Sequence, residues 1–240
     1  MSWLFEPAAQ PSLAIAGSEQ RFAVRRIWCV GRNYAGHVRE MGGDPQRDPP
    51  FFFAKPADAL VEAPQLVEEG HLGEALVPYP PQTADFHHEV ELVVALGGGG
   101  RGLSLEAATA AIAGYAVGLD MTRRDVQASA KKGGQPWEMA KSFDHSAVCS
   151  AVQRVGSIGH PRSGAIELSV NGDLRQHGDL RELIWSVPEV IAHLSQWVEV
   201  RAGDLIYTGT PEGVGPVVPG DLITARIAGV TLLQARVIQG

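Results

Sequence analysis

Apolar and polar residues alternate over much of the chain with the period of a β-strand, and few stretches show the period of a helix. The alternation in residues 85–96 places four side chains on one face of a predicted strand: His87, Glu89, Glu91 and Val93. Asn171-Gly172 lies between two alternating stretches and predicts a tight hairpin. Further strands are predicted at residues 27–30, 51–53, 114–119, 166–170, 174–177, 205–208, 222–227 and 231–237.

Helices are expected to be few and short. Residues 34–41 and the alanine-rich residues 104–113 predict two of them. Thr122–Asp125 resembles a capping box that opens a third helix, with a polar glycine loop following over Lys131–Pro136. Ser186–Glu189 predicts a capping box before a fourth helix. That helix is predicted to carry one apolar stripe, made of Val190, Ile191, Leu194 and Trp197.

These elements predict an α+β protein that is mainly β, with a large mixed or antiparallel sheet and short flanking helices. A chain of 240 residues is long enough to bury a sizeable core. Residues 1–24 are expected to form an extended N-terminal segment, and residues 25–240 a single domain that carries the functional site. Within this domain, residues 62–84 hold four prolines and predict short strands and loops.

Composition narrows the class of partner. The net charge of −7 argues against nucleic acid or an anionic membrane as the main partner. No segment approaches the ~20 consecutive apolar residues of a membrane helix. The two cysteines, Cys29 and Cys149, are far apart in sequence, which argues against a cysteine zinc site and suits a reducing compartment. A cytoplasmic protein with a small-molecule ligand is therefore expected.

Three acidic residues are the candidate metal ligands. Glu89 and Glu91 share a strand face and lie roughly 6–7 Å apart along it. A solvated face is the simpler interpretation, but two buried like charges would require a cation. Asp120 ends a predicted strand, where it serves either as a helix cap or as a third carboxylate. Three carboxylates favour Mg²⁺, with Mn²⁺ or Ca²⁺ as alternatives, over Zn²⁺.

Other polar residues could complete a catalytic site. His37 and Glu40 share a helix face, where they form either a surface pair or a dyad that activates water. Arg124 and Gln127 lie one turn apart and could bind a carboxylate. Lys141, among apolar residues, either reaches solvent or meets an anion inside. Thr210 offers a hydroxyl within a glycine-rich loop that would allow the backbone to approach a ligand.

Gly97–Gly102 formally matches the GxGxxG pattern of dinucleotide-binding proteins. We reject that interpretation for two reasons. The preceding strand alternates charged and apolar residues, whereas a central parallel strand is apolar on both faces. Hairpin strands, and not strand–helix–strand units, fill the C-terminal half. A glycine turn is expected instead.

Taken in order, the motifs resemble the fumarylacetoacetate hydrolase family, over about residues 25–240. The matching segments are Cys29–Ala35, His37 with Glu40, Phe53–Pro56, His88–Leu92, Gly118–Thr122, Gln135–Trp137, Ala140–Phe143, Asp204–Ile206 and Gly209–Gly215. The chain resembles the short members of the family, which have a single domain.

The resemblance implies a β-roll fold, a homodimer, and Mg²⁺ or Mn²⁺ held by Glu89, Glu91 and Asp120. It also implies that His37 and Glu40 activate water. Four residues would line the substrate pocket: Lys141, Arg124, Gln127 and Thr210.

The implied activity is hydrolysis of a carbon–carbon bond in an acylpyruvate, such as 3-fumarylpyruvate. Decarboxylation of oxaloacetate, broad acylpyruvase activity and isomerase or hydratase activity are the alternatives. A dicarboxylate substrate needs a second cation, for which Arg32, Arg123 and Lys55 are the candidates.

Overall fold

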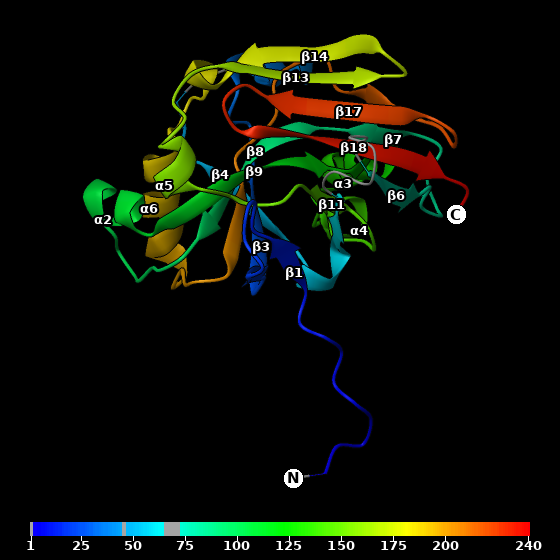
Figure 1. Ribbon diagram of the computed structural model, residues 1–240. Coiled ribbons are helices and arrows are strands. Elements are labelled where there is room, and N and C mark those ends of the chain that lie inside the picture. The colour runs from blue at the N-terminus through cyan, green and yellow to red at the C-terminus, as the bar shows by residue number, and fades with distance from the viewer. Residues whose placement is uncertain (1, 45–46, 65–72) are drawn as a thin grey trace.

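Two mixed β-sheets stacked face to face make up most of the protein, as the computed structural model shows (Figure 1). The structure describes residues 2–44, 47–64 and 73–240. The predicted mainly-β α+β class with a mixed sheet is confirmed. Within the described residues, no helix has the length and apolar character needed to cross a membrane.

The larger sheet has eight strands, and parallel and antiparallel neighbours are mixed in it. Its strands lie in the order β4 (Phe51–Lys55), β3 (Arg26–Gly31), β15 (Asp204–Tyr207), β8 (Val90–Leu96), β9 (Ile112–Asp120), β11 (Ala147–Cys149) and β5 (Leu60–Glu62), with β12 (Gln153–Arg154) also paired to β9.

The second sheet has five strands and covers one face of the first (Figure 1). Its strands lie in the order β14 (Asp173–Asp179), β13 (Ala165–Val170), β17 (Leu222–Ile227), β18 (Thr231–Ile238) and β6 (Glu74–Pro78). Smaller sheets join β10 (Thr122–Arg123), β7 (Phe86–His88) and β16 (Gly215–Pro216), and β1 (Ser12–Ala14) with β2 (Arg21–Ala23).

The helices are short and lie at the ends and edges of the sheets. In Figure 1, α2, α5 and α6 gather at one end, and α3 and α4 lie at the other. The helices are α1 (Ala35–Glu40), α2 (Leu105–Ala110), α3 (Arg124–Gly133), α4 (Glu138–Lys141), α5 (Val155–Ile158) and α6 (Val187–Trp197), with the 3₁₀ turns η1 (Ala57–Ala59) and η3 (Leu180–Glu182).

The central strand β8 is buried on both faces, and its two faces belong to different cores. Leu92 and Val94 pack in the core between the two sheets. Val93 and Ala95 face the opposite way, into a smaller core that β1, β3 and β15 help to close. Because Glu91 shares the face of Val93, it lies at the border of this smaller core.

Most predicted elements are present, but three local predictions were wrong. Thr122 does not cap α3, because it belongs to β10 and its hydroxyl donates to the carbonyl of Asp120. The helix α3 continues to Gly133, so the predicted loop at Lys131–Pro136 begins only at Gly134, which has a φ of 60°. Trp197 is 77% exposed, because it ends α6 beyond the part of the stripe that packs on the core.

The other predicted turns are present. Gly97–Gly102 follows β8, which pairs antiparallel with β9, so the dinucleotide interpretation was rightly rejected. The strand β8 is central and buried on both faces, but it runs antiparallel to both of its neighbours, β15 and β9, so it is not the central parallel strand of a dinucleotide-binding fold. Ser186 donates both its N–H and its hydroxyl to Glu189, as in a capping box. Of the predicted strand and loop region 62–84, residues 65–72 lie outside the described residues.

The extended N-terminal segment contains a hairpin. Strands β1 and β2 pair antiparallel, and Leu13 and Val24 are fully buried in the smaller core. Residues 2–9 leave the body of the protein as an arm (Figure 1).

Asn171 stabilises the β13–β14 hairpin. Its φ of 54° is unfavourable for most residues with a side chain, and its amide pairs with Asp221 and with the N–H of Leu222. Asn171→Ala is expected to lower the free energy of unfolding by about 1–3 kcal/mol in urea titrations. Asn171→Gly should lose less, because glycine accepts this φ. Asp173→Ala, at an exposed neighbouring position, should change the free energy of unfolding by less than about 0.5 kcal/mol. An equal loss of stability in Asn171→Ala and Asp173→Ala would contradict the stabilising role of Asn171.

Candidate active site

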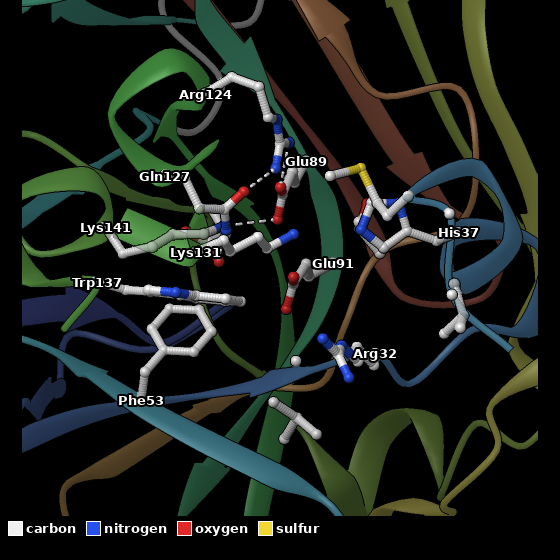
Figure 2. A pocket seen from close by; sticks show the side chains of 18 residues that line it. Arg32, His37, Phe53, Glu89, Glu91, Arg124, Gln127, Lys131, Trp137 and Lys141 are labelled. Carbon is white, nitrogen blue, oxygen red and sulfur yellow. Dashed lines mark hydrogen bonds and ion pairs between the residues drawn. The ribbon is translucent and has the colours of Figure 1, made fainter. Parts of the chain in front are cut away.

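A cavity of about 180 Å³ opens beside the ends of β8 and β9, between α1 and α3. The predicted site residues converge on it: His37, Glu89, Glu91, Asp120, Arg32, Arg124, Gln127, Lys141 and Thr210 line the cavity. Figure 2 shows those of them that it labels, such as His37, Glu91 and Arg124, projecting from several elements toward one space. Glu40 lies behind His37 and does not line the cavity itself.

Glu89, Glu91 and Asp120 form a buried acidic cluster. Their exposed fractions are 4%, 2% and 1%, and one oxygen from each lies within 4.8 Å of the others. The sheet register brings them together, since Val90 pairs with Leu119 and the N–H of Asp120 donates to the carbonyl of Glu89 at 2.9 Å. The solvated-face interpretation of Glu89 and Glu91 is therefore wrong.

Two cations offset part of this negative charge from the pocket side. The ammonium of Lys141 donates to Glu89 at 2.8 Å and to Asp120 at 2.9 Å. Arg124 donates to Glu89 at 2.5 Å and to the side-chain oxygen of Gln127 at 2.7 Å. Burial alone would raise the pKa of Glu89, but Lys141 and Arg124 together hold it well below its usual range. Glu89 therefore carries its charge in the folded protein.

Glu91 is the least compensated member of the cluster. The backbone N–H of Gly209 donates to it at 2.7 Å, but no lysine or arginine of the described residues forms an ion pair with it. Its burial, followed by the charges of Asp120 and Glu89, raises its pKa well above the usual value. One more positive charge would satisfy this carboxylate.

The cluster fits a hard divalent cation. Asp120 Oδ1 lies 2.8 Å from the ammonium of Lys55 but makes no hydrogen bond within the described structure. That oxygen and the carboxylate of Glu91 thus keep lone pairs available for a metal. Three carboxylates are the donor set that Mg²⁺ and Mn²⁺ prefer.

His37 and Glu40 form a dyad on α1. The Nδ1 atom of His37 lies 3.1 Å from Glu40, whose other oxygen accepts the N–H of Gly213 at 3.0 Å. A carboxylate at Nδ1 favours the tautomer with hydrogen on that nitrogen, which leaves Nε2 as a proton acceptor. The ring lines the cavity across from the acidic cluster (Figure 2).

Gln176 holds the wall that carries Thr210, although no pattern in the sequence pointed to this residue. This fully buried side chain on β14 donates to the Thr210 hydroxyl at 2.8 Å and to the carbonyl of Pro211 at 2.9 Å. Its oxygen accepts the N–H of Val90 and faces His88 Nδ1, each at 3.0 Å. A residue of the second sheet thus joins the start of β8 to the Thr210 loop.

Sequence reasoning also missed three residues of the cavity wall. Lys131 lies 5.2 Å from the ring centre of Trp137, which in turn lies 6.0 Å from the ring of Phe53. All three line the cavity. Arg124, Gln127 and Lys131 follow one helix face, so the spacing would have revealed Lys131 if α3 had been predicted to its true end.

Of the three candidates for a second cation, only Arg32 lines the cavity. Lys55 is fully buried, where it pairs with Asp120 and donates to the carbonyls of Met121 and Lys141. Arg123 stacks 4.3 Å from the ring centre of Phe143 and donates to the carbonyl of Met139. Of these three alternatives, Arg32 is therefore the one whose position suits a second cation in the cavity.

Comparison with known proteins agrees with this geometry. A family model described as fumarylacetoacetate (FAA) hydrolase C-terminal matches residues 26–238. The chain is 43% identical to the fumarylpyruvate hydrolase of Ralstonia sp over 187 residues, which are 78% of this chain and 92% of that protein. It is 40% identical over 212 residues to the oxaloacetate tautomerase YcgM of Escherichia coli, covering 88% of this chain and 92% of that one.

A solved relative carries ions and ligands. The crystal structure of fumarylpyruvate hydrolase from Pseudomonas aeruginosa in complex with Mn²⁺ and pyruvate is 50% identical and has a TM-score of 0.95, with 100% of both chains covered.

Removing one carboxylate of the cluster should weaken metal binding. We expect Asp120→Asn to raise the dissociation constant of Mn²⁺ by about tenfold or more, since even residues outside the ligand set change metal affinity by 10–100-fold. Titration followed by the electron paramagnetic resonance of free Mn²⁺ measures this. The exposed acid Glu138, changed to Gln, is the matched control. Equal Mn²⁺ affinity in the Asp120→Asn and Glu138→Gln variants would show that the acidic cluster does not bind the metal.

Proposed function

The chain belongs to the fumarylacetoacetate hydrolase family, and on that premise we propose that it is a metal-dependent hydrolase of acylpyruvates. The proposed substrate is 3-fumarylpyruvate, and the products are fumarate and pyruvate. The observation that carries the proposal is the His37–Glu40 dyad facing the acidic cluster across a cavity that Lys141 and Arg124 also line. The relative solved with Mn²⁺ and pyruvate supports it.

The proposed metal is Mg²⁺ or Mn²⁺, held by Glu89, Glu91 and Asp120. When bound, it would supply Lewis-acid polarisation of the substrate's oxo group. Other parts of the site hold the rest of the substrate. Arg124 and Gln127 are placed to bind the carboxylate next to that oxo group, through the fork geometry of the guanidinium and the amide.

Lys141 acts as a fixed positive charge. Its burial would lower its pKa, but Asp120 and Glu89 outweigh burial and raise the pKa above the usual value. The lysine therefore stays protonated and is unsuited to act as a base. It stabilises the negative charge that develops on the departing pyruvate enolate, a preorganised contact of the kind that contributes several kcal/mol in enzymes.

The dyad moves the proton. His37 Nε2 accepts a proton from water while the water oxygen bonds to the acyl carbonyl carbon. The bond between that carbon and C3 of the pyruvate unit then breaks, and its electron pair passes to the pyruvate enolate. The imidazolium of His37 returns the proton to C3. Fumarate and pyruvate leave, and Glu40 holds the imidazole in place throughout.

Oxaloacetate is the substrate of a second candidate function. Several relatives named oxaloacetate tautomerase are 40–44% identical to this chain. Tautomerisation needs proton transfer at C3 without attack by water, and the same dyad and cations could serve it. Decarboxylation would instead release carbon dioxide from the same substrate.

One substrate panel separates these functions. The protein is assayed with Mn²⁺ or Mg²⁺ against fumarylpyruvate, acetylpyruvate, fumarylacetoacetate and oxaloacetate, with and without chelator. Pyruvate release from fumarylpyruvate that stops on chelation supports the hydrolase. Conversion of enol to keto oxaloacetate, with no cleavage of any acylpyruvate, would replace the hydrolase by the tautomerase.

His37→Ala is expected to lower kcat by about 10²–10⁴-fold, because the proton acceptor is lost. Glu40→Gln should lower kcat less, since the imidazole remains. Mn²⁺ affinity should stay unchanged in both variants. Arg39, on the exposed side of the same helix, changed to Ala, controls for damage to α1. Unchanged kcat in His37→Ala would rule out the water-activating role.

We also propose that two copies associate as a homodimer. Trp3, Leu4 and Phe5 lie on the N-terminal arm with exposed fractions of 68%, 96% and 77%. Contiguous exposed apolar side chains mark interaction sites. Sedimentation equilibrium should give twice the chain mass of 25.6 kDa, and a single 25.6 kDa species at micromolar concentration would contradict the proposal.

A further inference from the structure

Two basic side chains line the cavity without an anionic partner. Arg32 and Lys131 are both exposed, and neither forms an ion pair or a hydrogen bond through its side chain within the described residues. The deeper cations differ in this respect. Arg124 and Lys141 are both engaged with Glu89. The outer part of the cavity therefore has positive charge that the protein itself does not neutralise.

The uncompensated cations lie away from the site proposed for the pyruvate carboxylate. Figure 2 shows Arg32 and Arg124 on opposite sides of the pocket, with Glu91 between them and Lys131 reaching into the space. Burial lowers the pKa of Lys131, and the charges of Arg124 and Arg32 lower it further. The three cations thus repel one another, and an anion placed among them would relieve that repulsion.

The backbone around Arg32 is built to present this side chain. Arg32 has a φ of 61°, a conformation that is costly for a residue with a long side chain. The next residue, Asn33, is buried and donates to the carbonyls of Trp185 and Thr208, at 3.0 and 2.8 Å. Its side-chain oxygen accepts the N–H of Trp185 at 2.7 Å. These bonds hold the turn that directs Arg32 to the cavity.

We propose that Arg32 and Lys131 form a second carboxylate site, which binds the far end of a dianionic acylpyruvate. This inference rests on the proposed function and names its substrate class: acylpyruvates whose acyl group ends in a carboxylate. The near carboxylate binds at Arg124 and Gln127, the reacting carbons lie beside the acidic cluster, and the far carboxylate lies between the two outer cations.

The test compares kcat/KM for fumarylpyruvate, which has a far carboxylate, with kcat/KM for acetylpyruvate, which has none. We expect Arg32→Met to lower the ratio of the two values by about 10–100-fold, the size of one charge-assisted hydrogen bond. Lys131→Met should also lower this ratio. Arg32→Lys keeps a positive charge at the position, so its ratio should lie between those of Arg32→Met and the wild type. Lys132→Met removes the same charge from the neighbouring position, which does not line the cavity, and should leave the ratio unchanged.

Each other outcome has a distinct meaning. An equal loss on both substrates, or no loss on either, would overturn the second carboxylate site. Wild-type protein that cleaves acetylpyruvate but not fumarylpyruvate would also overturn it and leave the hydrolase standing. Wild-type protein that cleaves neither would overturn the proposed function itself. If Arg32→Met does not fold, as circular dichroism would reveal, Lys131→Met and Lys132→Met decide the question.

Discussion

Burial of three carboxylates at one point is the constraint on which the rest of the site depends. Glu89, Glu91 and Asp120 are nearly inaccessible to solvent, and isolated buried charges are very costly. The protein reduces this cost with Lys141 and Arg124 from the pocket side and with Lys55 from behind. The compensation is incomplete at Glu91, whose pKa is raised by burial because no lysine or arginine of the described residues pairs with it, and a divalent cation would supply the missing positive charge.

The sequence predicted the parts of the site that depend on local spacing. Alternation placed Glu89 and Glu91 on one strand face, and helical spacing paired His37 with Glu40. Asp120 was predicted at the end of a strand because a helix start is predicted directly after it. The hairpin at Asn171 was predicted for the same reason, because its turn chemistry is local.

What the sequence could not supply depends on contacts between distant segments. Lys55 is an ordinary strand-ending lysine in the sequence, and only the approach of β4 to the end of β9 buries it against Asp120. Gln176 lies on a hairpin strand that is mostly polar in sequence, which is typical of an exposed strand. Its side chain is nevertheless buried and accepts the N–H of Val90 at the start of β8 in the other sheet. Thr122 fits a capping pattern, but pairing with β7 places it in a strand, and tertiary pairing overrides the local signal.

One glycine-rich loop joins the separate functions of the site. In the segment from Gly209 to Gly213, the N–H of Gly209 holds Glu91 and the N–H of Gly213 holds Glu40. Thr210, between them, is fixed by Gln176. Gly209 has a φ of 102°, and a Cβ there would lie 2.8 Å from that of Asn33, the residue that directs Arg32. The acidic cluster, the dyad and the outer cation are therefore positioned by the same short stretch of backbone, so a shift of this loop changes all three together.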